Sequence, residues 1–240
     1  MEKEETDSFA KRFYNKLTAP RTIKYTVISG LVIYLGLLII AVVVASITKP
    51  IYTIWNNYIS DLGSINDTAV PILYDLACIF AGILLIPFHF YLEKHIAPIP
   101  RKKEDYRTHR WAFRLTGLGW FINMFGSFFY VGVGIFSADR SVPLTPDIDV
   151  HRVCSYGAFG GFTFAAIFIG IALLFVHQDI IPKPYKYPIG LIGIFVPISV
   201  TILNIIFGGP LLEWCLLFAI LTWIIPLSLF TLRHTEKQLK

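Results

Sequence analysis

Charged residues are scarce in this chain. They make up 15% of its 240 residues, whereas 55% are hydrophobic and the mean hydropathy is +0.62. A water-soluble domain carries roughly 25% charged residues, and long uncharged runs have no place on a water-exposed surface. The composition therefore excludes a soluble enzyme, a disordered tail and a nucleic-acid-binding module, and it indicates an integral membrane protein.

Cysteine and histidine are also few, with three and six residues, and the chain has no CxxC pair, P-loop, GxGxxG motif or internal repeat. These absences disfavour an ATPase, a dinucleotide-dependent enzyme and a transporter built from inverted repeats. A metal centre needs several converging ligands, but the histidines are scattered along the chain. We therefore expect no metal and no cofactor. Cys154 and Cys215 have similar predicted depths, so whether they pair stays open.

Long apolar runs are what the sequence has in abundance. A helix needs about 20 residues to cross the hydrocarbon core of a bilayer, and it satisfies its own backbone hydrogen bonds there. We predict an all-α membrane protein: a six-transmembrane-helix bundle in residues 25–232, between a basic segment (1–24) and a short tail (233–240). The predicted spans are Tyr25–Ile47, Val70–Leu92, Phe113–Phe136, Val153–Val176, Pro188–Phe207 and Leu211–Leu232.

The distribution of Lys and Arg predicts the orientation. Of the 21 basic residues, 18 fall in the two terminal segments and in alternate loops, which an even number of spans places on one side. The other side has Lys49, Arg140 and Arg152. Because basic residues concentrate in cytoplasmic loops, we expect both termini in the cytoplasm and the protein in the plasma membrane.

The side predicted to be outside is rich in acids. Asp75 lies within the span that begins at Val70, and an ionisable group in a span normally faces the bundle interior and has a partner. Arg140, Arg152 and His151 are the candidate partners. An outer-face polar pocket is predicted from Ser60, Asp61, Asp75, Asn123, Tyr130, Asp139 and His151.

These polar residues allow two interpretations. His151 with Asp61 or Asp139 could form a general base, with Ser60 or Ser137 as the nucleophile. The simpler interpretation is that they join the outer loops by hydrogen bonds, and that Asn123 and Tyr130 hold helices together. Asn66 starts an Asn-Asp-Thr glycosylation sequon on this side, and the sequence does not decide whether it is used.

The cytoplasmic side is basic. Phe9, Phe13 and Leu17 recur every four residues among Lys and Arg, which predicts a short interfacial helix. The Arg101-Lys102-Lys103 stretch could hold anionic lipid headgroups, or its charges could serve only to orient the chain. In the fourth span, Gly157, Gly161 and Ala165 form a ridge of small residues that favours close helix packing.

The first outer loop reads Asn57-Tyr58-Ile59-Ser60-Asp61-Leu62-Gly63, and its Ile-Ser-Asp-x-Gly pattern resembles that of the Frag/DRAM/Sfk superfamily. The run from Gly134 to Asp139, followed by His151, is most similar to the prokaryotic branch called domain of unknown function 998. The resemblance covers about residues 25–232 and implies a six-helix bundle whose eukaryotic relatives are linked to lipid remodelling, phosphoinositide control and autophagy. Many relatives would have a proline near Ser137, and no agreed catalytic role accompanies the motifs.

The leading hypothesis is a lipid-associated membrane protein that is not an enzyme, with membrane lipids as partners and no nucleic acid. One alternative is an enzyme that modifies acyl or headgroup moieties with an outer-face Asp/His pair. Another is a small transporter or channel, in which Asp75 and Asn123 would line a path. The oligomeric state cannot be read from the sequence.

Overall fold

The structure is a computed structural model that describes residues 8–48, 52–96, 110–176 and 178–240. It confirms the all-helical prediction: six of its helices are long and apolar enough to cross a membrane, and no β-strand occurs in the described residues. The helices are α1 (Phe9–Leu17), α2 (Pro20–Thr48), the short 3-10 helix η1 (Ile59–Gly63), α3 (Ile72–Ile96), α4 (Arg110–Ile135), α5 (Val150–Phe175), α6 (Lys183–Phe207) and α7 (Pro210–Gln238).

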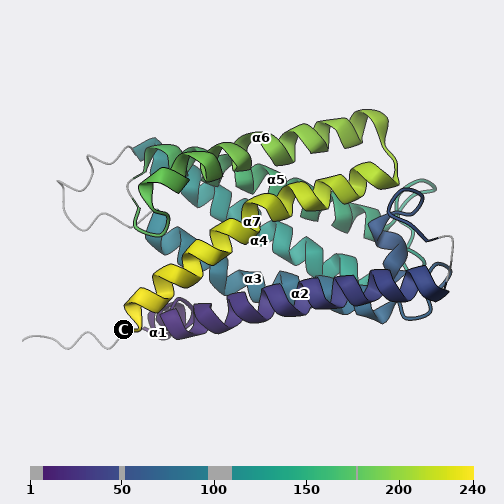
Figure 1. The fold of residues 1–240 in the computed structure, drawn as a ribbon, viewed down its shortest axis with the longest axis horizontal. Coiled ribbons are helices and arrows are strands. Elements are labelled where there is room, and N and C mark those ends of the chain that lie inside the picture. The colour runs from purple at the N-terminus through teal and green to yellow at the C-terminus, as the bar shows by residue number, and fades with distance from the viewer. Residues whose placement is uncertain (1–7, 49–51, 97–109, 177) are drawn as a thin grey trace, which may run out of the picture.

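The long helices run alongside one another, and each packs against the next in the chain (Figure 1). Contacts between α2 and α7 close the bundle. The loop with η1, the α4–α5 connection and the α6–α7 turn lie together at one end, which we call the η1 end. Helix α1 and the end of α7 lie at the opposite end, the α1 end, as an even number of spans requires (Figure 1).

The turn between α6 and α7 is tight, as the predicted spans require, because they leave only residues 208–210 between Phe207 and Leu211. Gly208 and Gly209 have φ values of +64° and +98°, a backbone conformation that only glycine adopts readily. Pro210 then begins α7 at a position where its missing N–H leaves no bond unmade. The two helices are therefore forced into an antiparallel hairpin.

The bundle interior divides into two clusters of buried side chains, one toward each end. The cluster toward the η1 end includes Tyr34, Tyr74 and Trp214. The other, toward the α1 end, includes Phe88, Tyr91 and Trp223. Large apolar side chains such as Ile205 and Phe207 are exposed on the outside of the bundle, where hydrocarbon would surround them.

Candidate functional site at the η1 end

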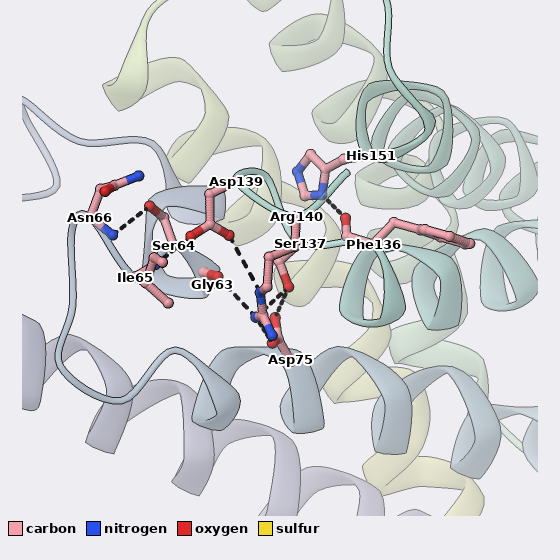
Figure 2. Close-up of polar contacts among 10 residues, drawn as sticks. All are labelled: Gly63, Ser64, Ile65, Asn66, Asp75, Phe136, Ser137, Asp139, Arg140 and His151. Carbon is pink, nitrogen blue, oxygen red and sulfur yellow. Dashed lines mark hydrogen bonds and ion pairs between the residues drawn. The ribbon is translucent and has the colours of Figure 1, made fainter. Parts of the chain in front are cut away.

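An ion pair between Asp75 and Arg140 forms the centre of the candidate site (Figure 2). Asp75 lies in the first turn of α3, and its side chain is only 4% exposed. Arg140, in the α4–α5 connection, places its Nη2 atom 2.6 Å from Asp75 Oδ2. Ser137 Oγ donates to Asp75 Oδ1 over 2.9 Å and accepts from Arg140 Nη2 over 2.7 Å. Of the three candidate partners for Asp75, the structure selects Arg140.

Two glycines allow α4 and η1 to lie close to the beginning of α3 at this site. A Cβ atom on Gly134 of α4 would collide with the backbone carbonyl oxygen of Asp75. A Cβ atom on Gly63, at the end of η1, would lie 2.9 Å from Asp75 Oδ1. Side chains at these positions would push α4 and η1 away from α3. Both glycines belong to the motifs that carry the family resemblance, which gives those motifs a structural reason.

Asp139 ties the α4–α5 connection to the first loop. Its Oδ2 atom accepts a hydrogen bond from the backbone N–H of Ile65 over 2.7 Å. Its Oδ1 atom lies 3.5 Å from Arg140 Nε. Consecutive residues thus hold two different segments, Asp139 the first loop and Arg140 the start of α3 (Figure 2).

The guanidinium of Arg140 is held in place on one side and open on the other. Its contacts run through Nη2 and Nε, and Nη1 has no partner among the residues that the structure describes. The side chain is 49% exposed. The hydrogen bond with Asp75 raises the pKa of Arg140 still further above the neutral range, so the group stays charged. The site therefore presents a fixed cation at the boundary of the bundle.

His151 takes no part in this ion pair. Its Nδ1 atom lies 2.6 Å from the backbone carbonyl oxygen of Phe136, so Nδ1 carries the proton, because a carbonyl can only accept. Nε2 is then left to accept from Ser155 Oγ at 3.3 Å. Neither of these bonds involves Asp61 or Asp139, the acids that the sequence suggested for a general base. In Figure 2 the imidazole is directed toward Phe136 and away from Asp75.

Asp61 and Ser60 stabilise η1 itself. Asp61 Oδ2 accepts from the backbone N–H of Tyr58 over 2.9 Å and from Asn57 Nδ2 over 3.4 Å. The backbone of Ser60 is hydrogen-bonded to Glu213 of α7. Trp214 Nε1, on the next residue, donates to the carbonyl oxygen of Asn57 over 3.1 Å. These contacts attach η1 to the beginning of α7, and none of them involves Asp75 or Arg140.

Asp61 makes the stability of this loop depend on pH. Burial raises the pKa of its carboxyl, and the hydrogen bonds from Tyr58 and Asn57 only partly oppose this. A carboxyl with a higher pKa in the folded than in the unfolded protein stabilises the fold at low pH, and that contribution is lost as pH rises through the folded pKa. We expect the unfolding temperature of the wild type to fall, relative to Asp61→Asn, as pH rises above about 4, the unfolded value.

The unfolding temperatures of the wild type and Asp61→Asn are measured in the same detergent at a series of pH values above about 4. Asn keeps an oxygen that can accept from the Tyr58 N–H, so the difference in unfolding temperature between the two proteins reports the effect of the carboxylate charge. A difference that stays constant with pH, or that changes in the opposite direction, would contradict the assignment.

Two of the predicted pocket residues lie elsewhere in the bundle. Tyr130 OH donates to Tyr34 OH over 2.7 Å, joining α4 to α2. Asn123 Nδ2 lies 2.8 Å from His89 Nδ1, and His89 Nε2 lies 2.8 Å from Ser127 Oγ. Asn123, His89 and Ser127 are almost completely buried between α3 and α4. These contacts hold helices together, and His89 is a partner that sequence reasoning missed.

Other predictions from the sequence have simple outcomes. Cys154 and Cys215 are free thiols, as is Cys78, so the pairing that was left open is not formed. Asn66 is exposed, and its glycosylation stays a prediction. The Arg101-Lys102-Lys103 stretch lies outside the described residues. Within the described ranges, no three His, Cys, Asp or Glu side chains lie together as metal ligands would.

Comparison with known proteins places the chain in a family. The family model described as Protein of unknown function (DUF998) matches residues 32–229, which include all the residues of the Asp75–Arg140 site. No curated protein and no solved structure matches the chain. Membership of the wider Frag/DRAM/Sfk superfamily stays a prediction. With its six long apolar helices and this match, the chain is a multi-pass membrane protein that belongs to the DUF998 family.

Proposed function

We propose that this chain is a non-enzymatic, lipid-binding membrane protein, and that Arg140 binds the phosphate of a phospholipid headgroup in the outer leaflet. The observation that carries the proposal is the half-exposed guanidinium, fixed by Asp75 and with Nη1 unoccupied among the described residues. Nη1 carries two N–H donors, and an arginine N–H forms a charge-assisted hydrogen bond to a phosphate oxygen. The Lys and Arg distribution predicts that the η1 end faces outward, at the level of the headgroups.

The local charge favours a zwitterionic headgroup. Asp75 and Asp139 together carry one more negative charge than Arg140 supplies, so a headgroup with only negative charge is repelled from the surroundings of the guanidinium. Phosphatidylethanolamine or phosphatidylcholine can place its phosphate at Arg140, and its cationic group is attracted by the net negative charge of this site. We therefore expect these lipids to be preferred over phosphatidylglycerol.

The contacts of the site disfavour both alternatives. An Asp/His general base needs His151 to bond to an acid, but its ring nitrogens bond to Phe136 and Ser155. A channel through Asp75 and Asn123 needs both residues on one path, but they belong to two separate networks of contacts. A lipid site needs neither arrangement.

Lipid mass spectrometry of gently purified protein tests the proposal. The proteins compared are the wild type, Arg140→Lys and the control Arg152→Gln, which changes another exposed arginine at the same end. Lysine keeps a positive charge beside Asp75, but it has a single ammonium nitrogen in place of the separate nitrogen atoms with which Arg140 can contact Asp75 and a phosphate. We expect the wild type to retain a zwitterionic phospholipid. Its occupancy should fall about tenfold or more in Arg140→Lys, because one lost charge-assisted hydrogen bond is worth about 1.5–3 kcal/mol, and it should stay unchanged in Arg152→Gln.

Two results would overturn the proposal. One is equal occupancy in the wild type and in folded Arg140→Lys. The other is chemical conversion of the retained lipid by the wild type that is lost in His151→Ala, because that would favour the enzyme.

A further inference from the structure

Helix α1 has one apolar and one basic face. On a helical projection, Phe9, Phe13 and Leu17 share one side with Ala10 and Tyr14, whereas Lys11, Arg12, Asn15 and Lys16 occupy the other. The Phe9 and Phe13 rings stack with centroids 6.4 Å apart. Ser8 caps the helix, and its Oγ atom accepts from the backbone N–H of Lys11. A nine-residue helix of this pattern is too short to cross a membrane and suits an interface.

The fold holds α1 where a bilayer surface would be. It ends at Leu17, and α2, the first helix long enough to span, begins at Pro20. Tyr14 OH donates to Glu93 Oε2 of α3 over 3.0 Å. Lys94 Nζ donates to Thr18 Oγ1 over 3.1 Å. Figure 1 shows α1 almost end-on beside the start of α2, so it lies across the direction of the spans.

The two phenylalanines on the apolar face of α1 are not covered by the rest of the described protein. Phe9 is 77% exposed and Phe13 is 56% exposed. Tyr14, at the edge of this face, packs on α3, where its ring meets Phe90 edge-on at 5.9 Å, and Leu17 at the end of the helix is partly buried. Two stacked phenylalanines in water at this position would be unfavourable, whereas acyl chains would bury them.

The charges near α1 indicate the lipid type. Residues 9–24 contain five Lys or Arg residues and no Asp or Glu, and the acids nearest in sequence, within residues 2–7, precede the helix. Lys24 is paired with Glu236 of α7 at 3.3 Å, whereas Arg12, Lys16 and Arg21 are exposed. Anionic headgroups attract basic residues beside a membrane helix.

We propose that α1 lies in the cytoplasmic leaflet at the α1 end, with Phe9 and Phe13 inserted among the acyl chains and its basic residues in contact with anionic headgroups. This binding surface is independent of the proposed phospholipid site at the η1 end. It is a fixed part of the fold, because Tyr14 and Thr18 attach α1 to α3.

Nitroxide labels on the full chain test the proposal. In a background with Cys78, Cys154 and Cys215 changed to Ala, single cysteines are introduced as Phe13→Cys and, for the opposite face, Asn15→Cys. The labelled proteins are reconstituted into phosphatidylcholine discs with or without phosphatidylglycerol. Collisions with oxygen, which concentrates in hydrocarbon, and with a water-soluble nickel chelate then report the depth of each label.

We expect the Phe13→Cys label to lie about 5–10 Å into the boundary between headgroups and acyl chains, and the Asn15→Cys label to contact the nickel chelate freely. Phosphatidylglycerol should move the Phe13→Cys label deeper. Equal contact of both labels with the nickel chelate would overturn the proposal, and so would dipolar broadening that shows α1 packed on a second copy. A depth that does not respond to phosphatidylglycerol would overturn the role of anionic headgroups.

Discussion

Gly161→Ala is expected to destabilise the bundle by about 2–3 kcal/mol, at the upper end of the range for overpacked cores. A Cβ atom on Gly161 of α5 would lie 2.7 Å from the Cα atom and 3.0 Å from the backbone nitrogen of Gly126 in α4. Both are main-chain atoms, so relief requires the two helices to separate. In a membrane the hydrophobic effect does not drive helices together, so their association depends on close packing, which small residues allow.

The neighbouring residue provides a matched control. A Cβ atom on Gly160 would meet nothing within 4 Å, and Gly160 belongs to the same helix. Gly160→Ala therefore gains the same intrinsic helix propensity without the collision, and it should be neutral or slightly stabilising. Thermal unfolding of both variants in detergent measures the difference. Similar losses in the two variants would mean that the contact between Gly161 and Gly126 does not limit the packing of α4 on α5.

Arg140→Met is expected to cost about 2 kcal/mol, because it leaves the buried Asp75 carboxylate with Ser137 as its remaining side-chain partner. Breaking a fully buried pair costs about 3–5 kcal/mol, and the exposure of Arg140 lowers that figure here. Adding Asp75→Asn to Arg140→Met should recover most of the lost stability, because the double variant has no unpaired buried charge at this site. Asp75→Asn alone should cost less than Arg140→Met, because water can solvate the guanidinium.

A double-mutant cycle measures this coupling from the four unfolding free energies. Strong non-additivity is expected, with the double variant more stable than Arg140→Met. If the losses of stability in the two single variants simply add up in the double variant, the ion pair contributes nothing to the stability of the fold. Arg152→Met, which removes an arginine whose Nε lies 3.9 Å from Asp149, is the control and should change stability little.

Hydropathy predicted the six spans well but not where the helices end. Helix α2 begins at Pro20, ahead of the predicted Tyr25, and α7 continues past Leu232 to Gln238. The reason is physical: hydropathy detects the length that must lie in hydrocarbon, whereas helical hydrogen bonds continue through polar residues at the interface. The tight turn at Gly208 and Gly209 was predictable, because chain length and residue type together leave few alternatives.

The candidate site was only partly predictable for a related reason. Sequence position gives the depth of Asp75 in the membrane, and depth alone requires a partner. The choice of Arg140 over Arg152 and His151 depends on how the α4–α5 connection folds back, which local patterns do not encode. Likewise, Asn123 and His89 could be assigned a depth, but their contact depends on the rotation of α3 against α4.

The ion pair also sets an order for biosynthesis. Asp75 enters the membrane with α3, but Arg140 and Ser137 are made only after the whole of α4. Until then the carboxylate near the start of α3 has neither of the side chains that complete its hydrogen bonds. The native contacts of Asp75 with Ser137 and Arg140 therefore form only after residue 140 has been synthesised.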